Sequence, residues 1–234
     1  MPAKPSTPAF TGFPAEGTRF LKGLAANNNK AWFDAHRAAY DDCLIEPAKA
    51  FVDAIGPRLR KFAPAVKAEP RVNGSIMRIN RDVRFSKDKS PYKTTFDLWF
   101  WEGENRGWDM PGFFFRLESD RLILGAGQHH LEKQQLDRFR EGVVDDKTGR
   151  ALVKTIDGVR VAGPYSVYGA ERKTVPRGFD ASHPRASLLL HVGLFAAFEA
   201  PTPREVSTPK FVEFCADHFR AMAPINTWLR SVLT

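Results

Sequence analysis

The segment from Arg78 to Lys93 holds the densest group of side chains that can do chemistry. It contains six bases and two acids, a net charge of +4, which is half of the +8 of the whole chain. Arginine and lysine bind phosphate and carboxylate oxygens through charge-assisted hydrogen bonds. The segment therefore favours the binding, or the binding and turnover, of a small anionic or phosphate-bearing ligand. The residues expected to bind it are Arg78, Asp82, Arg84, Ser86, Lys87, Lys89, Tyr92 and Lys93.

A β-strand would place the first part of this group on one face. Between Ser75 and Phe85, apolar residues recur at almost every second position, which is the period of a strand. Alternate side chains of a strand lie about 6.6 Å apart on the same side. The polar residues of the opposite face are expected to form one row: Arg78, Asn80, Asp82 and Arg84.

A stiff corner is expected to follow the strand. Pro91 fixes its own backbone φ and restricts Ser90 to extended conformations. A stiff corner holds Tyr92 and Lys93 in a reproducible position, as a binding site requires. If the polar face lines a pocket, the Tyr92 hydroxyl should lie within hydrogen-bond reach of the charged side chains of the strand. The alternative is that the Tyr92 ring packs in the core and that Lys93 points to solvent.

Two other interpretations of the same segment are open. In the first, Asp82 and Asp88 neutralise the arginines, and the segment is an internal salt-bridge network of a structural or partner-binding protein. In the second, the segment binds nucleic acid, because exposed aromatic rings beside basic residues can stack on nucleobases. The rings available for this are Trp99, Trp101 and Trp108, although the chain contains no known nucleic-acid-binding motif.

The usual motifs for metal, cofactor or nucleophilic chemistry do not occur in the sequence. It has no His-Glu-x-x-His or Cys-x-x-Cys pattern, so we expect no metal site. It has no Gly-x-Ser-x-Gly, and Gly125-Ala126-Gly127 is too short for a dinucleotide loop, so we expect no cofactor. His129 and His130 are adjacent and would point to opposite sides of a strand, so their role stays open. The sequence does not decide whether the protein is an enzyme.

The elements that position these residues begin with helices. Apolar residues at helical spacing predict helices over Ala15–Ala26, from Lys30 to about Leu44, and from Pro47 onward. Asn29 can cap the second helix with its side chain. Pro57 lies inside the third pattern and is expected to kink or split that helix.

Strands and further helices follow. A strand is predicted over Thr94–Trp101, and a hairpin joins Gly112–Leu117 to Arg121–Gly125. The rest of the chain is predicted as helices over Leu131–Val144 and Lys147–Ile156, strands over Val159–Tyr168 and Leu188–Phe198, and a final helix from Thr208 that Pro224 ends or interrupts. Short-range succession of strands favours antiparallel pairing. The order predicts an α+β fold, a mainly antiparallel sheet packed by N-terminal, middle and C-terminal helices.

The composition is that of a globular protein. The chain has 234 residues, 43% of them hydrophobic and 26% charged, which is enough to bury a core without disulfides. Cys43 and Cys215 are expected to be buried free thiols. We find no signal peptide and no apolar run that would span a bilayer, so we expect a cytoplasmic protein without membrane contact. Residues 1–9 are expected to form a disordered tail and residues 10–234 a single domain, and the oligomeric state is open.

The segment Arg81-Asp82-Val83-Arg84-Phe85-Ser86-Lys87-Asp88-Lys89-Ser90-Pro91-Tyr92-Lys93 resembles the hallmark of an uncharacterised family, domain of unknown function 2461, which occurs in bacteria and fungi. Further marks agree in order: Asn27-Asn28-Asn29-Lys30-Ala31-Trp32-Phe33, Gly125-Ala126-Gly127, and Arg177-Gly178-Phe179 with His183-Pro184. The resemblance runs from about residue 10 to the end and implies one domain. It implies no catalytic residues, because the family has no established activity. After Gly127, family members usually carry an aromatic residue and a proline-containing stretch, where this chain has Gln128-His129-His130.

Overall fold

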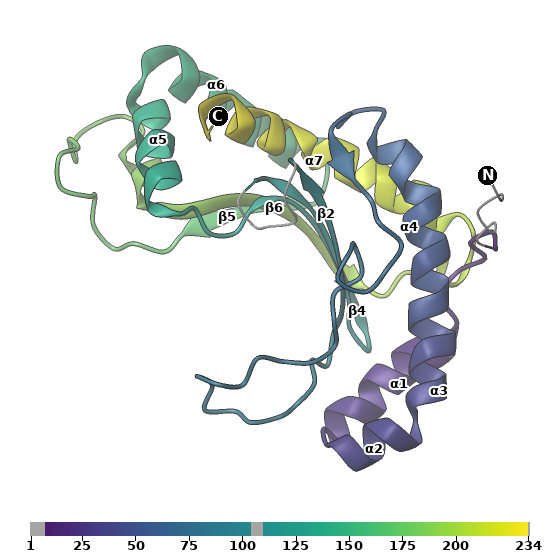
Figure 1. Ribbon diagram of the computed structural model, residues 1–234. Helices are drawn as coiled ribbons and strands as arrows, with labels where there is room; N and C mark the ends of the chain where they lie inside the picture. The colour runs from purple at the N-terminus through teal and green to yellow at the C-terminus, as the bar shows by residue number, and fades with distance from the viewer. Residues whose placement is uncertain (1–7, 104–109, 234) are drawn as a thin grey trace, which may run out of the picture. The chain divides into compact units, whose positions relative to one another are not determined.

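The computed structural model describes residues 8–103 and 110–233, and its strands form one antiparallel sheet in the order β1-β2-β3-β4-β6-β5. The strands are β1 Val66–Lys67, β2 Phe96–Glu102, β3 Gly112–Leu117, β4 Arg121–Gln128, β5 Tyr165–Ala170 and β6 His191–Pro201. The α-helices are α1 Ala15–Ala26, α2 Lys30–Ala35, α3 Arg37–Tyr40, α4 Glu46–Leu59, α5 Lys133–Val144, α6 Asp146–Ala162 and α7 Phe211–Leu233. The predicted α+β class with an antiparallel sheet is confirmed (Figure 1).

The chain divides into two compact units. The first comprises Met1–Phe100, Phe114–Ile123 and Glu199–Ala216, and the second comprises Trp101–Phe113, Leu124–Phe198 and Asp217–Thr234. A single domain over residues 10–234 stays a prediction. Most of the expected tail over residues 1–9 lies outside the described residues.

Aromatic rings form the centre of the first unit. The ring centroid of Phe13 lies 5.9 Å from that of Phe51 and 5.9 Å from that of Phe115, and Phe211 lies 5.7 Å from Phe51. All four side chains are at most 1% exposed. Aromatic pairs at this spacing stabilise a core beyond the apolar area that they bury. The cluster therefore joins the segment before α1 to α4 and β3.

The first helices of this unit follow the sequence closely. α1 has the predicted bounds, and the Asn29 side chain caps α2 by accepting a hydrogen bond from Trp32 N at 3.0 Å. The single helix expected from Lys30 to Leu44 is instead broken at His36, where φ is −113° and ψ is 14°. The His36 Nδ1 atom lies 2.8 Å from Trp32 O, so a side chain helps to close the turn at the break. A π-helical turn over Asp41–Ile45 then leads into α4.

Two prolines lie inside helices without ending them. Pro57 is near the end of α4, and beyond it Arg60 N still donates to Gly56 O at 3.1 Å. A proline removes its own amide donor and crowds the carbonyl four residues earlier, but here the amides that follow it still close the last turn. Pro224 lies inside α7, which continues because the residues that follow, including Leu229, are buried. The expected end or interruption at Pro224 is therefore wrong. Of the two alternatives at Pro57, the split is wrong and the kink stays a prediction.

The strand expected over Ser75–Phe85 does not form within the described chain. Isolated bridges occur there instead, and one of them pairs Asn80 with Tyr92. The Asp82 Oδ1 atom accepts a hydrogen bond from Arg84 N at 3.2 Å, which gives the main chain a local partner in place of a neighbouring strand. In Figure 1 this part of the chain is a long loop without regular structure between β1 and β2.

The next strands agree with prediction, with shifted bounds. β2 begins two residues later than expected and is buried along its whole length. The predicted hairpin between β3 and β4 is confirmed, and Glu118 N donates to Arg121 O at 2.8 Å across its turn. Trp99 and Trp101 are 4% and 2% exposed, so neither ring of β2 is available to stack on a nucleobase. Trp108 lies outside the described residues.

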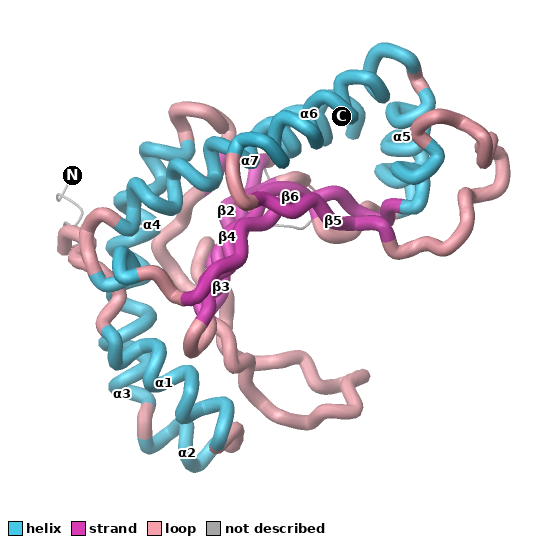
Figure 2. The backbone as a smooth tube through the Cα atoms, turned by 180° about the vertical axis from the view of Figure 1, so that it is seen from behind, coloured by secondary structure: helices cyan, strands magenta, loops and turns pink. Residues whose placement is uncertain are grey.

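The second unit contains α5, α6, β5, most of β6 and most of α7, and Figure 2 shows β5 and β6 side by side. α6 runs to Ala162 and so replaces the first part of the strand expected over Val159–Tyr168. The reason is that its buried stripe, Leu152, Ile156 and Val159, keeps the helical period. β5 pairs antiparallel with β6, which begins at His191 after a 3-10 turn.

Two further expectations concern the state of the cysteines and the presence of membrane-spanning helices. Both cysteines are free thiols, as predicted, but Cys43 is half-buried whereas Cys215 is buried. Of the helices in the described part of the chain, none combines the length and the apolar content that a membrane crossing needs.

Candidate functional site

A pocket of about 350 Å³ lies in the first unit, against the segment that the sequence singled out. Its buried members, the floor, are mostly aromatic: Phe33, Tyr40, Ile45, Ile79 and Tyr92. Its more exposed members, the rim, are mostly charged or polar: Lys30, Asp34, Arg37, Asp41, Val72, Arg78 and Asn80. Small-molecule sites have volumes of about 300–1,000 Å³, so this pocket is large enough for a small ligand.

Two distant segments of the sequence meet at this pocket. The Asn28 side chain binds both main-chain groups of Tyr92: its Nδ2 donates to Tyr92 O at 2.9 Å, and its Oδ1 accepts from Tyr92 N at 3.1 Å. The Phe33 and Tyr92 rings stack, with centroids 4.3 Å apart and an angle of 20° between their planes. These contacts form the Asn28 clamp, which fixes the far end of the loop against the start of α2.

Tyr92 and Lys93 take positions that differ from the expected ones. The Tyr92 ring is 7% exposed and forms part of the floor. Within the described residues its hydroxyl makes no hydrogen bond with Arg78, Asp82 or Arg84, so that expected contact is not formed. The buried ring matches the alternative expectation. The other half of the alternative is wrong, because Lys93 Nζ turns inward to Asp97 Oδ2 at 3.2 Å.

The rim carries a small positive excess. Lys30 is paired with Asp34, and Arg37 Nε lies 3.5 Å from Asp41 Oδ2. Arg78 is exposed and takes part in no ion pair with the described residues. Three bases minus two acids leaves a charge of +1, and the base without a carboxylate partner is Arg78.

The floor favours binding over acid–base chemistry. Burial raises the pKa of Tyr40 well above its usual value, so this hydroxyl stays protonated at neutral pH. The carboxylates of the rim, Asp34 and Asp41, are occupied by bases of the same helical segment. The lining therefore offers cationic groups and flat rings to a ligand, without a paired nucleophile and base.

The remaining predicted site residues lie in the loop, away from the pocket lining. Asp82 and Arg84 pair with each other at 2.7 Å, and their side chains are 45% and 77% exposed. The side-chain hydrogen bond from Arg84 lowers the pKa of Asp82. Lys89 Nζ donates to Val83 O at 3.0 Å, and Lys87 is exposed. The expected row of polar side chains on one strand face therefore does not exist.

Arg81 and Asp88 hold the loop together through contacts between its own residues. Arg81 is ion-paired with Asp88 and donates to Ser86 Oγ at 3.4 Å and to Ser90 O at 3.3 Å. Asp88 also accepts from the Ser90 hydroxyl at 2.6 Å. The hydrogen bonds from Ser90, and then the one from Arg81, lower the pKa of Asp88 to about 2. This part of the motif orders the loop around Asp88, whereas the Asp82–Arg84 pair lies at the surface.

A buried ion network that the sequence did not predict stands at the end of the loop. Asp97 is 7% exposed and accepts from Arg116 Nε at 2.8 Å, from Thr95 Oγ1 at 3.0 Å and from Lys93 Nζ. Burial acts to raise the pKa of Asp97, but the hydrogen bond and charge of Arg116 and the charge of Lys93 outweigh it, and the pKa is lowered. The sequence signal that could have indicated this network was one acidic residue, Asp97, within the apolar run that forms β2.

The sequence also missed the helical side of the pocket. Lys30, Asp34, Arg37 and Asp41 follow one another at intervals of four, three and four residues, which places them on one face of a helix. That spacing was a usable signal for a charged helix face. What it could not show is that Arg78 and Tyr92 come to lie opposite this face.

We next consider the histidines and acids of the described residues as possible metal ligands. Among the described residues, no group of three or more histidine, cysteine, aspartate or glutamate side chains is placed to hold a metal ion. The His129 ring stacks on Phe195 at 5.0 Å, and the His218 Nδ1 atom lies 3.0 Å from the Tyr165 hydroxyl. These two histidines are therefore engaged in packing and hydrogen bonding within the second unit.

Comparison with known proteins identifies one family. A family model described as "Conserved hypothetical protein (DUF2461)" matches residues 16–228. The matched range contains every residue that lines the pocket. No curated protein matches the chain.

Proposed function

Because the chain belongs to the DUF2461 family, described only as conserved hypothetical proteins, we propose its function from the pocket of the first unit: it binds a small molecule that joins a flat apolar body to an anionic or phosphate group. This retains the anionic ligand expected for the segment from Arg78 to Lys93. It moves the binding groups to Arg78 and Tyr92 of that segment and adds Lys30 and Arg37 of the helical segment.

The position of Arg78 is the main observation that supports this proposal. Its guanidinium group lies at the rim of the pocket without an ion-pair partner among the described residues. A guanidinium group presents donors in a rigid fork that matches two oxygens of a phosphate or carboxylate. Lys30 and Arg37 share the rim, and although both have carboxylate partners, their charges add to the attraction for an anion.

The floor supports the flat apolar part of the ligand. Phe33 and Tyr92 form a parallel stack, and Tyr40 lies in the same floor. Aromatic rings favour offset stacking or edge-to-face packing against another ring. The Asn28 clamp fixes Tyr92 at both main-chain groups, so the ring keeps its position when the pocket is empty or filled.

Adenosine monophosphate and adenosine are suitable first probes, because they share a flat body and differ in the phosphate. The ¹³C-labelled δ1 methyl groups of Ile45 and Ile79 report on this pocket directly. We expect AMP to shift both methyl signals and adenosine to bind about tenfold more weakly, since a charge-assisted hydrogen bond contributes about 1.5–3 kcal/mol. A thermal-shift screen of metabolites would then widen the ligand class.

A matched pair of arginine variants tests the role of Arg78. Arg78→Gln should reduce AMP affinity to the level of adenosine. Arg84→Gln removes another exposed arginine of the same loop, one that does not line the pocket, and it should leave AMP affinity unchanged. Equal losses in the two variants, or no difference between AMP and adenosine, would refute the proposed site.

Single-stranded nucleic acid is the second candidate, and one observation favours it. Phe85 is 96% exposed, and the Arg84 guanidinium lies 5.9 Å from its ring centroid. An exposed ring among bases can stack on a nucleobase. Affinity for a labelled single strand should then fall with salt, with a log–log slope of about −0.7 for each phosphate contacted. Phe85→Ala should abolish binding, and an oligonucleotide that shows no binding at low salt excludes this candidate.

The structural interpretation is the third candidate. Arg81 and Asp88 cross the loop, and Asp97 anchors its end, so much of the charge of the segment acts inside the protein. On this interpretation the protein has no small-molecule ligand, and the AMP experiment and the metabolite screen both give no binding.

A further inference from the structure

A second and larger pocket, of about 620 Å³, lies entirely within the second unit. It is formed by α6, β5 and the segment from Pro184 to His191, which begins at the second residue of the His183-Pro184 motif. Much of its lining is apolar: Val153, Ile156, Val167, Pro184, Leu188 and Leu190. Its polar and charged side chains are few: Asp157, Arg160, Tyr168, Arg185, Ser187 and His191. A mainly apolar pocket with a few polar groups is the usual form of a small-molecule site.

His191 is a buried polar side chain of this pocket, and one of its ring nitrogens lacks a partner among the described residues. It is 8% exposed, and its Nδ1 atom is buried without a hydrogen bond to any described residue. Burial lowers the pKa of His191, so the ring is neutral at neutral pH. A buried polar atom without a partner destabilises the folded state. A polar ligand atom in the pocket would relieve that cost.

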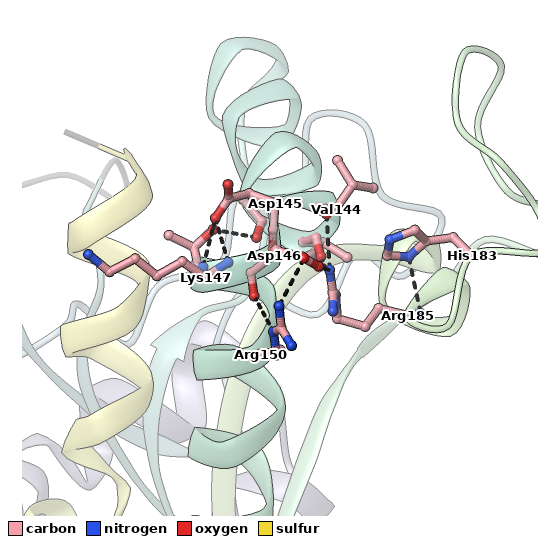
Figure 3. Close-up of polar contacts among 10 residues, drawn as sticks. Val144, Asp145, Asp146, Lys147, Arg150, His183 and Arg185 are labelled. Carbon is pink, nitrogen blue, oxygen red and sulfur yellow. Dashed lines mark hydrogen bonds and ion pairs between the residues drawn. The ribbon is translucent and has the colours of Figure 1, made fainter.

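Arg185 is held in place by the ends of two helices, as Figure 3 shows. Its Nε donates to Val143 O at 2.7 Å, and its Nη2 donates to Val144 O at 3.0 Å and to Asp145 O at 3.2 Å. The guanidinium also lies close to Gly149, where an added Cβ would stand 2.5 Å from Nε. The third nitrogen, Nη1, makes no hydrogen bond with the described residues. Arg185 therefore presents a fixed and partly unused donor group to the pocket.

The remaining charges give the pocket a small positive excess. Arg160 Nη1 lies 3.9 Å from Asp157 Oδ1, and both side chains are more than half exposed. With Arg185, two bases oppose one acid in the lining, which leaves a charge of +1 there. Asp146, outside the lining, is 78% exposed and lies 3.5 Å from Arg185 Nη2. Tyr168 and Val153 are 41% and 39% exposed, so apolar surface is open to solvent at the pocket. One excess positive charge and a mainly apolar lining suit a ligand with a single negative charge and an apolar body.

We propose that the pocket of the second unit binds a monocarboxylate with an extended apolar body. The carboxylate lies at Arg160 and at the Nη1 atom of Arg185, and His191 Nδ1 gains a hydrogen-bond partner. The apolar body contacts the aliphatic side chains of α6 and of the segment before His191. This site is independent of the function proposed for the first unit, since the two pockets share no residue.

Octanoate and 1-octanol are the probes, because they share an apolar chain and differ in charge. In a protein labelled at isoleucine δ1 methyl groups, Ile156 reports on this pocket, whereas Ile45 and Ile79 report on the other. Octanoate should shift the Ile156 signal and leave the other two in place. 1-Octanol should bind about tenfold more weakly, because it lacks the charge-assisted hydrogen bonds. Equal affinities for octanoate and 1-octanol, or shifts confined to Ile45 and Ile79, would overturn the proposal.

Two charge variants of α6 complete the test. Arg160→Gln should weaken octanoate binding about tenfold through loss of a charged donor. Lys154→Gln removes one positive charge from an exposed position of the same helix that does not line the pocket, and octanoate affinity should not change. Both side chains are exposed, so neither change should unfold the protein. If both variants lose affinity equally, or if neither does, the assignment of the carboxylate to Arg160 is wrong.

Discussion

Replacement of Asp97 by asparagine tests whether the loop is anchored by a buried charge. The substitution keeps the size of the side chain and removes the negative charge from three partners: Arg116, Lys93 and Thr95. The carboxylate is 7% exposed, whereas the side chains of Arg116 and Lys93 are 41% and 24% exposed. After the change, both cations can regain contact with water, but the hydrogen bonds to Asp97 lose their ionic component.

The structure sets the expected size of this effect. Breaking a fully buried ion pair costs about 3–5 kcal/mol, and a hydrogen bond to a charged group contributes about 1.5–3 kcal/mol. Because Arg116 is well over a third exposed, we discount the first range and expect a loss of about 2–3 kcal/mol in the free energy of unfolding. For a chain of this size that corresponds to a fall of roughly 4–12 °C in Tm.

The effect should also depend on pH in a defined direction. The pKa of Asp97 in the folded protein is lowered, whereas an unfolded aspartate has a pKa of about 3.9. Its charge therefore stabilises the protein fully above that value, and the contribution is lost as pH falls through the folded pKa. The difference in stability between the wild type and Asp97→Asn should be constant near neutral pH and narrow below about pH 4.

Urea unfolding followed by tryptophan fluorescence would measure both effects. Asp82→Asn is the matched control, because Asp82 also pairs with an arginine but at an exposed position. It should leave the free energy of unfolding nearly unchanged at neutral pH. Equal losses for the two variants, or a loss for Asp97→Asn that does not narrow in acid, would refute the distinction between a buried and an exposed pair.

Two further changes test the clamp and a helix. Asn28→Ala should lower the free energy of unfolding by about 1–3 kcal/mol in urea titrations, because both main-chain groups of Tyr92 lose their partner; an unchanged midpoint would contradict the clamp. Gly158→Ala should raise stability by about 0.5–1 kcal/mol, because Gly158 lies inside α6 and nothing stands within 4 Å of an added Cβ; a loss of Tm would show that the position is not open.

Helices were the most predictable part of the fold. α1 could be predicted to its end residues because its buried stripe has a helical period and the asparagines after Ala26 mark its end. The break at His36 and the continuation of α7 through Pro224 were harder to predict, because they depend on contacts that the helical spacing of apolar residues does not encode. Pro224 lies in a helix that buries residues on both sides of it, and tertiary packing there outweighs the missing amide donor.

The candidate site was less predictable, because apolar and polar residues alternate along its central segment although that segment is not a strand. Phe85 falls on the apolar face of the predicted strand, yet it is 96% exposed. Local hydrogen bonds, such as those from Ser90 to Asp88, satisfy the polar groups within the loop and remove the need for a neighbouring strand. Arg78 and Tyr92 do line a pocket, but that the charged helix face lies opposite them could be found only from the three-dimensional fold.

The pocket can form only when residues far apart in the sequence come together, because the Asn28 clamp joins its two sides. The clamp joins positions 64 residues apart, so neither the helical segment nor the loop can form the pocket alone. Closing so long a stretch of chain costs conformational entropy before any contact compensates for it. A ligand that needs both segments binds only after this closure, and its binding energy therefore stabilises the closure itself. Ligand binding should thus slow amide exchange along the whole path between Asn28 and Tyr92, including residues that never touch the ligand.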